Sequence, residues 1–194
     1  TVLRDCKEHQ EIDIDRIIYM IDLVSCSQNG NDVPMEIQKT SSNYQHHLLI
    51  PRWSDRLEAV GRRGVIRCYQ YTLEKGRPLW GEGDPRPKSE IEVWDHATPD
   101  RFKQYLTRGK CKHENKTRNT TTSSGVTSNE DTMIAHYYDK LLHIARPPPG
   151  LVRNVYLERA GSNGSSELVH ICVEFGLTGR VDEDYIRNLI SEQK

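Results

Sequence analysis

Apolar residues recur at helical spacing along much of the chain, and this pattern predicts a protein built from helices. Residues 11–25 keep the i, i+3, i+4, i+7 spacing of an amphipathic helix, with acidic residues and one arginine between the apolar positions. The apolar positions are Ile14, Ile17, Ile18 and Ile21. Residues 28–32 are turn formers, which end this helix.

A second helix is expected to begin at Ser54, a favourable N-cap residue, with Asp55 and Glu58 in its first turn, where the helix dipole stabilises carboxylates. Each glycine in a helix costs about 0.8 to 1 kcal/mol relative to alanine, so two in one apolar stripe indicate close contact with a neighbouring helix. We therefore expect residues 54–71 to form the most buried element. The stripe is Leu57, Gly61, Gly64, Cys68 and Tyr71.

The middle of the chain is less regular. Residues 74–88 contain three prolines and three glycines, which predicts a long loop. Residues 90–94 are the one strand candidate, and Thr98, Pro99 and Asp100 read as the N-cap and first two positions of a short helix. Residues 107–132 are almost entirely polar, which predicts a disordered insertion. Its basic first part, 108–118, is either a phosphate-contacting patch or a solvated linker.

Helical spacing returns in the last third of the chain. One helix is predicted at 133–145, ended by three prolines, and two more at 151–160 and 167–175, the latter with Gly176 at its C′ position. A last helix is expected to begin at Asp182. Its buried positions are predicted to be Tyr185, Ile186, Leu189 and Ile190.

These patterns predict an all-α fold in a single domain over residues 1–194, with a disordered insertion at 107–132 and additional C-terminal helices at 151–194. The charges nearly cancel, 27 Lys and Arg against 28 Asp and Glu, which argues against a dedicated nucleic-acid or membrane-surface binder. The five cysteines are odd in number and never form a C-x-x-C pair, and no signal segment opens the chain. We expect reduced thiols and a cytoplasmic location.

General site motifs for phosphate loops, dinucleotide binding, zinc proteases and serine hydrolases are absent from the sequence. Four blocks stand out instead: Ser54-Asp55-Arg56-Leu57-Glu58-Ala59-Val60-Gly61, Gly64-Val65-Ile66-Arg67, Lys75-Gly76-Arg77-Pro78, and His136-Tyr137-Tyr138-Asp139-Lys140-Leu141-Leu142. In order and character they resemble the C-terminal part of the HD-domain phosphohydrolase superfamily, in its uncharacterised bacterial-type branch. The resemblance covers about residues 48–144.

The resemblance implies an HD-domain-like helical bundle in which a His, a His-Asp doublet and a final Asp hold a divalent metal such as Mg, Mn or Fe. The final Asp falls on Asp55. Such an ion activates water and polarises a phosphoryl oxygen. Arg56, Lys75 and Arg77 would bind phosphate oxygens. His136 and Lys140 lie one helical turn apart, so they could face the same cleft or belong to a surface face beside the core.

Two features depart from the family pattern. The chain has no His-Asp dipeptide, and Trp53 precedes Ser54 where the bacterial branch tends to have another Asp. The chain opens on Thr1 rather than Met, which suggests that residues completing the metal site precede it.

Two functions stay open. The first is a metal-dependent phosphohydrolase of a nucleotide or another phosphorylated small molecule, active only when upstream residues complete the site. The second is an inactive HD-fold binding or structural subunit, with a protein partner or a second copy of itself. Neither reading involves a membrane or nucleic acid.

Overall fold

The computed structural model describes residues 13–35, 37, 43–117, 132–148 and 150–192. Every regular element within these ranges is helical, so the all-α prediction is confirmed for the described part of the chain. None of these helices is long and apolar enough to cross a membrane. The elements are α1 (Ile14–Asp22), α2 (Cys26–Asn29), the 3-10 helix η2 (Asn43–Leu49), α4 (Ile50–Glu58), α5 (Gly61–Glu74), α6 (Glu90–His96), α7 (Pro99–Thr117), α8 (Met133–His136), the π-helical turn η3 (Tyr137–Leu141), α9 (Leu142–Ala145), α10 (Val155–Thr178) and α11 (Glu183–Ser191).

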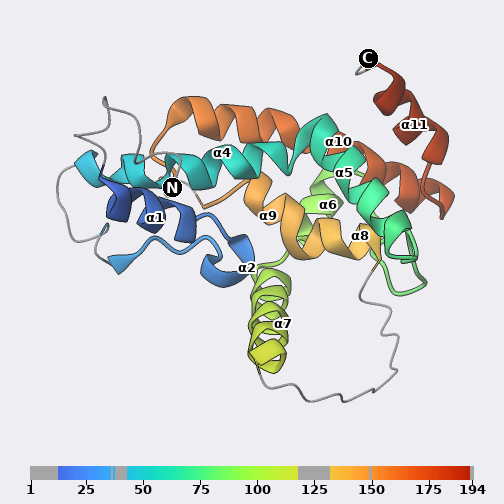
Figure 1. Cartoon of the computed structure of the whole chain (residues 1–194). Helices are drawn as coiled ribbons and strands as arrows, with labels where there is room; N and C mark the ends of the chain where they lie inside the picture. The colour runs from blue at the N-terminus through green and yellow to red at the C-terminus, as the bar shows by residue number, and fades with distance from the viewer. Residues whose placement is uncertain (1–12, 36, 38–42, 118–131, 149, 193–194) are drawn as a thin grey trace.

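The core lies where α5, the continuous α8–η3–α9 segment and α10 pack together (Figure 1). Burial of apolar side chains here supplies the main stabilisation of the fold, at about 25 cal/mol per Å² of apolar surface. The largest contributions come from fully buried aromatic and branched side chains, including Tyr137, Tyr138, Phe175, Leu142 and Leu168. A smaller cluster around Trp53 and Leu49 joins η2 and α4 to the loop before α10.

The predicted helix 54–71 is two helices, and this prediction was wrong in its boundaries. Leu49 is the N-cap of α4, Pro51 lies in its first turn, and Ser54 is in mid-helix. The chain breaks at Gly61, whose φ of +70° is a left-handed conformation that glycine adopts without steric cost. The stripe of glycines thus reflects a break between helices rather than one continuous face.

Close helix approach, the expected reason for the glycines, is also present at the break. A Cβ on Gly61 would lie 3.5 Å from the Cα of Gly164 in α10. A Cβ on Gly64 would lie 2.2 Å from the Ala59 carbonyl oxygen, so only glycine fits the turn. The most buried stretch is not this region, since Tyr71 is half exposed; it is residues 132–145, where only His136, Lys140 and His143 are not fully buried.

The C-terminal part contains one long helix where two were predicted. Helix α10 runs without a break through Gly176 and ends at Gly179, which has a φ of +76°. Gly176 is therefore an interior residue rather than a C′ residue. The last helix agrees with the sequence prediction, since the Asp182 side chain accepts a hydrogen bond from the backbone N–H of Tyr185 and so caps α11.

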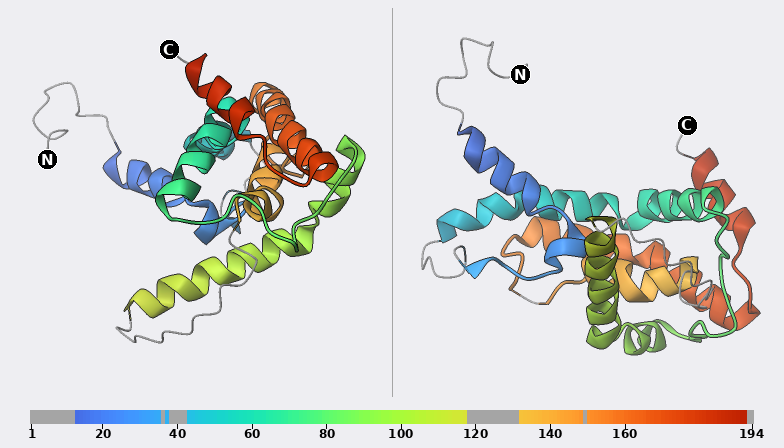
Figure 2. Two further views of the ribbon diagram at one scale, coloured as in Figure 1. Left: turned by 90° about the vertical axis from the view of Figure 1, so that its right-hand side faces the viewer. Right: turned by 60° about the horizontal axis from the view of Figure 1, so that its bottom comes forward.

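Two predictions for the middle of the chain were also wrong. The strand candidate 90–94 belongs to helix α6, where the Ser89 side chain accepts from the Glu92 N–H. Helix α7 begins at Pro99, as its capping pattern indicates, but it continues to Thr117, through the first part of the predicted disordered insertion. The remainder of that insertion, 118–131, lies outside the described residues. Helix α7 extends away from the other helices (Figures 1 and 2).

The first predicted helix is confirmed as α1, which is shorter than residues 11–25. The Asp13 side chain caps it by accepting from the Arg16 N–H. Its apolar face is largely uncovered, with Ile14, Ile18 and Ile21 exposed by 40%, 51% and 62%.

Candidate functional site

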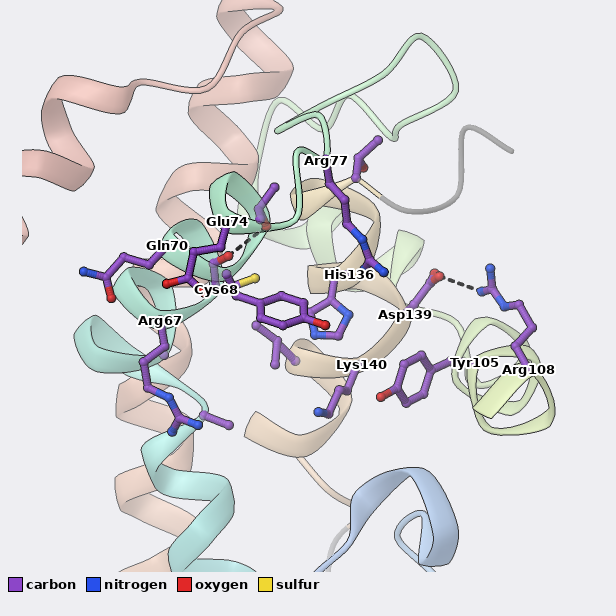
Figure 3. Close-up of a pocket in the computed structure, with 16 residues that line it drawn as sticks. Arg67, Cys68, Gln70, Glu74, Arg77, Tyr105, Arg108, His136, Asp139 and Lys140 are labelled. Atoms are coloured by element: carbon purple, nitrogen blue, oxygen red, sulfur yellow. Dashed lines mark hydrogen bonds and ion pairs between the residues drawn. The ribbon is translucent and has the colours of Figure 1, made fainter. Parts of the chain in front are cut away.

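A cavity of about 700 Å³ lies between α5, the 133–145 segment and α7. Figure 3 shows α5 on one side of it, the 133–145 segment in the middle and α7 on the other side. Many charged and polar side chains line its walls. They are Arg67, Gln70, Thr72, Glu74 and Arg77 from α5 and its following loop, Tyr105 and Arg108 from α7, and Thr132, His136, Asp139 and Lys140.

Positive charge predominates in this cavity. Arg67, Arg77, Arg108 and Lys140 line it together with two carboxylates, Glu74 and Asp139. Asp139 is 6% exposed and is held by two arginines, with its Oδ1 2.8 Å from Arg101 Nη2 and its Oδ2 2.8 Å from Arg108 Nη2. Its negative charge is thus more than matched locally, and the cavity is suited to an anion.

Aromatic rings lie among these cations. The Arg77 guanidinium carbon is 5.7 Å from the centre of the Tyr71 ring, and Lys140 Nζ is 5.9 Å from that of Tyr105. The His136 ring meets Tyr105 edge to face at a centroid distance of 5.9 Å. Burial raises the pKa of the Tyr105 hydroxyl, which therefore stays protonated as a hydrogen-bond donor. The cavity thus offers flat surfaces as well as charge.

The π-helical turn η3 brings several of these groups to the cavity. The Leu142 N–H donates to the carbonyl of Tyr137, five residues back, which widens the turn. Asp139 and Lys140, adjacent in sequence, consequently both line the cavity, together with His136 one turn earlier. Tyr137, Tyr138 and Leu141 face the core. Single π-helical turns are frequent at functional sites because they alter the register of side chains.

The structure brings together three of the six residues that the sequence indicated, namely Arg77, His136 and Lys140. Lys75 does not line the cavity; its Nζ lies 5.6 Å from the centre of the Tyr71 ring. Arg56 is inside the protein, where it donates to the Gly30 carbonyl and the Asn31 side chain. Its guanidinium also lies 4.6 Å from the centre of the Trp53 ring, and burial lowers its pKa to about 10.

Asp55 is an exposed residue in the second turn of α4, not in the first turn as its expected N-cap would place it. It lies one helical turn before Ala59, which lines the cavity. Asp55 itself does not line the cavity.

The metal that the resemblance implies needs more ligands than the described residues supply. Among them, no three or more His, Cys, Asp or Glu side chains are grouped so as to hold a metal ion. A catalytic ion takes about three protein ligands, and Asp55 alone provides one. The described residues therefore do not complete a catalytic metal site by themselves.

Sequence reasoning did not single out several charged or aromatic residues of the cavity, among them Arg67, Tyr105 and Asp139, and it placed Arg108 in a basic stretch that is either a phosphate-contacting patch or a linker. Arg101, Tyr105 and Arg108 recur at the i, i+4, i+7 spacing of a helix. This pattern indicates that the helix beginning at Pro99 continues through residue 108, where the sequence analysis expects a disordered insertion. Asp139 stands within the His136 to Leu142 block, yet nothing in the sequence shows that α7 packs on it.

A curated protein similar to this chain is "Uncharacterized protein L803" of Acanthamoeba polyphaga mimivirus, which is 33% identical over 159 residues. The match covers 82% of this chain and 54% of the viral protein, so the chain spans about half the length of that relative. No protein-family model matches the chain. No solved structure matches it either.

Proposed function

We propose that the α5–α7 cavity binds the phosphate group of a small phosphorylated molecule, with a nucleotide as the favoured class. The observation that carries this proposal is the set of four cations, Arg67, Arg77, Arg108 and Lys140, around one cavity in a protein of net charge −1. One arginine guanidinium can donate two parallel hydrogen bonds to the oxygens of a phosphate, and a lysine adds a compact positive charge. The half-exposed Tyr71 ring offers a surface on which a base can stack.

The reaction proposed for this ligand is metal-dependent hydrolysis of a phosphate ester, as the resemblance to HD-domain phosphohydrolases implies. Asp55, one helical turn before the cavity-lining Ala59, would be one metal ligand, with the others supplied from outside the described residues. His136, which lines the cavity, would donate a hydrogen bond to the bound phosphate. The alternative is a binding subunit in which the same cavity holds the ligand without turnover.

Binding is tested by titration calorimetry of the full chain with AMP, inorganic pyrophosphate and adenosine. We expect AMP and pyrophosphate to bind and adenosine to bind more weakly, because adenosine lacks the phosphate. Arg77→Ala should weaken AMP binding about 10-fold or more, which is typical of a lost hydrogen bond to a charged group. Arg63→Ala, an exposed residue on α5 that does not line the cavity, is the matched control.

Two results would contradict the binding proposal. One is the absence of AMP and pyrophosphate binding at millimolar concentration, and the other is equal affinity for AMP and adenosine.

Hydrolysis is tested on the protein in its natural length, by following phosphate release from nucleotides with Mg²⁺ or Mn²⁺ and with EDTA. Asp55→Asn should abolish release while leaving AMP binding in place, because a lost ligand misplaces the ion without removing the cations. Glu58→Gln, an exposed change in the same helix, should have no effect. Activity that survives Asp55→Asn would refute the role of Asp55, and binding without any turnover would favour the binding subunit.

A further inference from the structure

Helix α7 forms one wall of the cavity, and a single carboxylate of the neighbouring 133–145 segment holds two turns of it. Arg101 and Arg108 are seven residues apart, so they lie on one face of α7 two turns from each other. Arg101 Nε and Nη2 are both 2.8 Å from Asp139 Oδ1, and Arg108 Nη2 is 2.8 Å from Oδ2. Each carboxylate oxygen thus receives a different arginine.

The other contacts on this face of α7 involve the same segment. Tyr105, which lies between the two arginines, meets His136 and Lys140, and the Arg101 guanidinium lies 5.4 Å from the centre of the Tyr138 ring. Phe102 stacks on His143 at 4.9 Å between ring centres. Outside this face, Leu106 reaches Gly30 at the end of α2. Much of α7 extends away from the body, so these few contacts determine where its cavity-lining residues lie (Figure 2).

Arg108 has two functions in this arrangement. It lines the cavity and its guanidinium is paired with Asp139, whereas Arg101 shares that carboxylate without lining the cavity. Two arginines on one carboxylate leave a net positive charge, so Arg108 can attract an anion while it stays held.

We propose that Asp139 is the positioning residue of the site, which holds Arg108 and α7 against the cavity so that docking of α7 and binding of the phosphorylated ligand stabilise each other. This inference rests on the proposed function. By linkage, a ligand that contacts Arg108 favours the docked position of α7, and docking of α7 raises the affinity for that ligand by the same factor.

The direction in which Asp139→Asn changes phosphate affinity distinguishes a positioning role from an effect of charge alone. Asp139→Asn removes a negative charge from the cavity, so an effect of charge alone would tighten the binding of a phosphate. Loss of positioning has the opposite effect, because Arg108 and α7 are released. We expect Asp139→Asn to weaken the binding of inorganic pyrophosphate about 10-fold. Arg101→Ala, which keeps the Asp139–Arg108 pair, should weaken it less.

The decisive experiment is a double-mutant cycle on pyrophosphate affinity with Asp139→Asn and Arg108→Ala, measured by calorimetry on the full chain. When Asp139 acts mainly through Arg108, Asp139→Asn causes a much smaller loss in the Arg108→Ala background than in the wild type, whereas independent effects would add. Hydrogen exchange of the α7 backbone is the second readout. Pyrophosphate should slow it in the wild type and not in Arg108→Ala, a test that holds even where Asp139→Asn fails to fold.

Each outcome decides a different point. Tighter or unchanged binding by Asp139→Asn, full additivity in the cycle, or α7 exchange that pyrophosphate does not alter would overturn the positioning role alone. A wild-type protein that binds neither AMP nor pyrophosphate would overturn the proposed function and this inference together.

Discussion

Gly176 lies in the interior of α10 with the backbone of Pro87 directly against it. A Cβ at this position would lie 1.7 Å from the Pro87 carbonyl oxygen, a backbone atom that cannot move aside as a flexible side chain would. The loop over residues 74–88 can thus cross α10 only where the helix has no side chain. The sequence shows the glycine but not the loop above it, which is why Gly176 was predicted to end a helix.

The Gly176 contact leads to a prediction with an unusual sign. Replacing an interior helical glycine with alanine ordinarily stabilises a helix by about 1 kcal/mol. Gly176→Ala should instead lower the free energy of unfolding by about 1 to 3 kcal/mol, through overpacking against Pro87. Urea denaturation measures the difference, with the exposed Asn163→Ala in the same helix as control. A stability equal to or above that of the wild type would show that the loop does not rest on α10.

Two helix starts agree with the sequence prediction, whereas the predicted start at Ser54 and the predicted end at Gly176 do not. Asp182 and the pair Thr98-Pro99 mark the starts of α11 and α7, because a cap is a local interaction that the sequence itself contains. Interior features were located less well. The break at Gly61, the continuity of α10 and the length of α7 all depend on packing against segments distant in the sequence, and no local pattern encodes them.

Capping gives a prediction at this scale. Asp182→Ala removes the side chain that accepts from the Tyr185 N–H 2.9 Å away, and it should lower the free energy of unfolding by about 1 kcal/mol. Ser25→Ala is the matched control, since Ser25 is the N-cap of α2 but makes no side-chain capping hydrogen bond. Equal losses for the two variants, measured by thermal or urea unfolding, would contradict the assigned role of Asp182.

The site shows the same division between local and distant information. Arg77, His136 and Lys140 were found from sequence blocks and lie together in the cavity. Arg56 belongs to the same blocks, yet it holds the Gly30–Asn31 loop from inside the protein. A sequence block shows which residues are neighbours in the sequence, but only the packing of the helices determines which of their side chains are buried.

The whole molecule should lose stability in mild acid, and His143 is one cause. Burial lowers the pKa of His143 from its ordinary value of about 6.5, and nearby Arg101 lowers it further, while Asp139 and the Tyr138 carbonyl oppose the shift. The unfolded chain therefore takes up a proton on His143 at a higher pH than the folded protein. The stabilisation that neutral His143 contributes to the folded state is present above a pH of about 6.5, and it is lost as the pH falls toward the pKa of His143 in the folded protein.

We expect the urea midpoint to fall between pH 7.5 and pH 5.5, and we expect His143→Gln to reduce that fall. The exposed His96→Gln should leave it unchanged. A fall that is the same in His143→Gln as in the wild type would assign the acid sensitivity to other groups.

The π-helical turn at Tyr137–Leu141 has a consequence for how this protein can be related to others. A π-helical turn contains one residue more than the α-helical turn it replaces, so the chain carries an extra residue at the point where it enters the cavity wall. Deleting that residue would restore an ordinary α-helix, but it would rotate His136 by about 100° relative to the core residues of α9. A relative that aligns with a one-residue gap here would therefore keep the core and have a differently lined cavity.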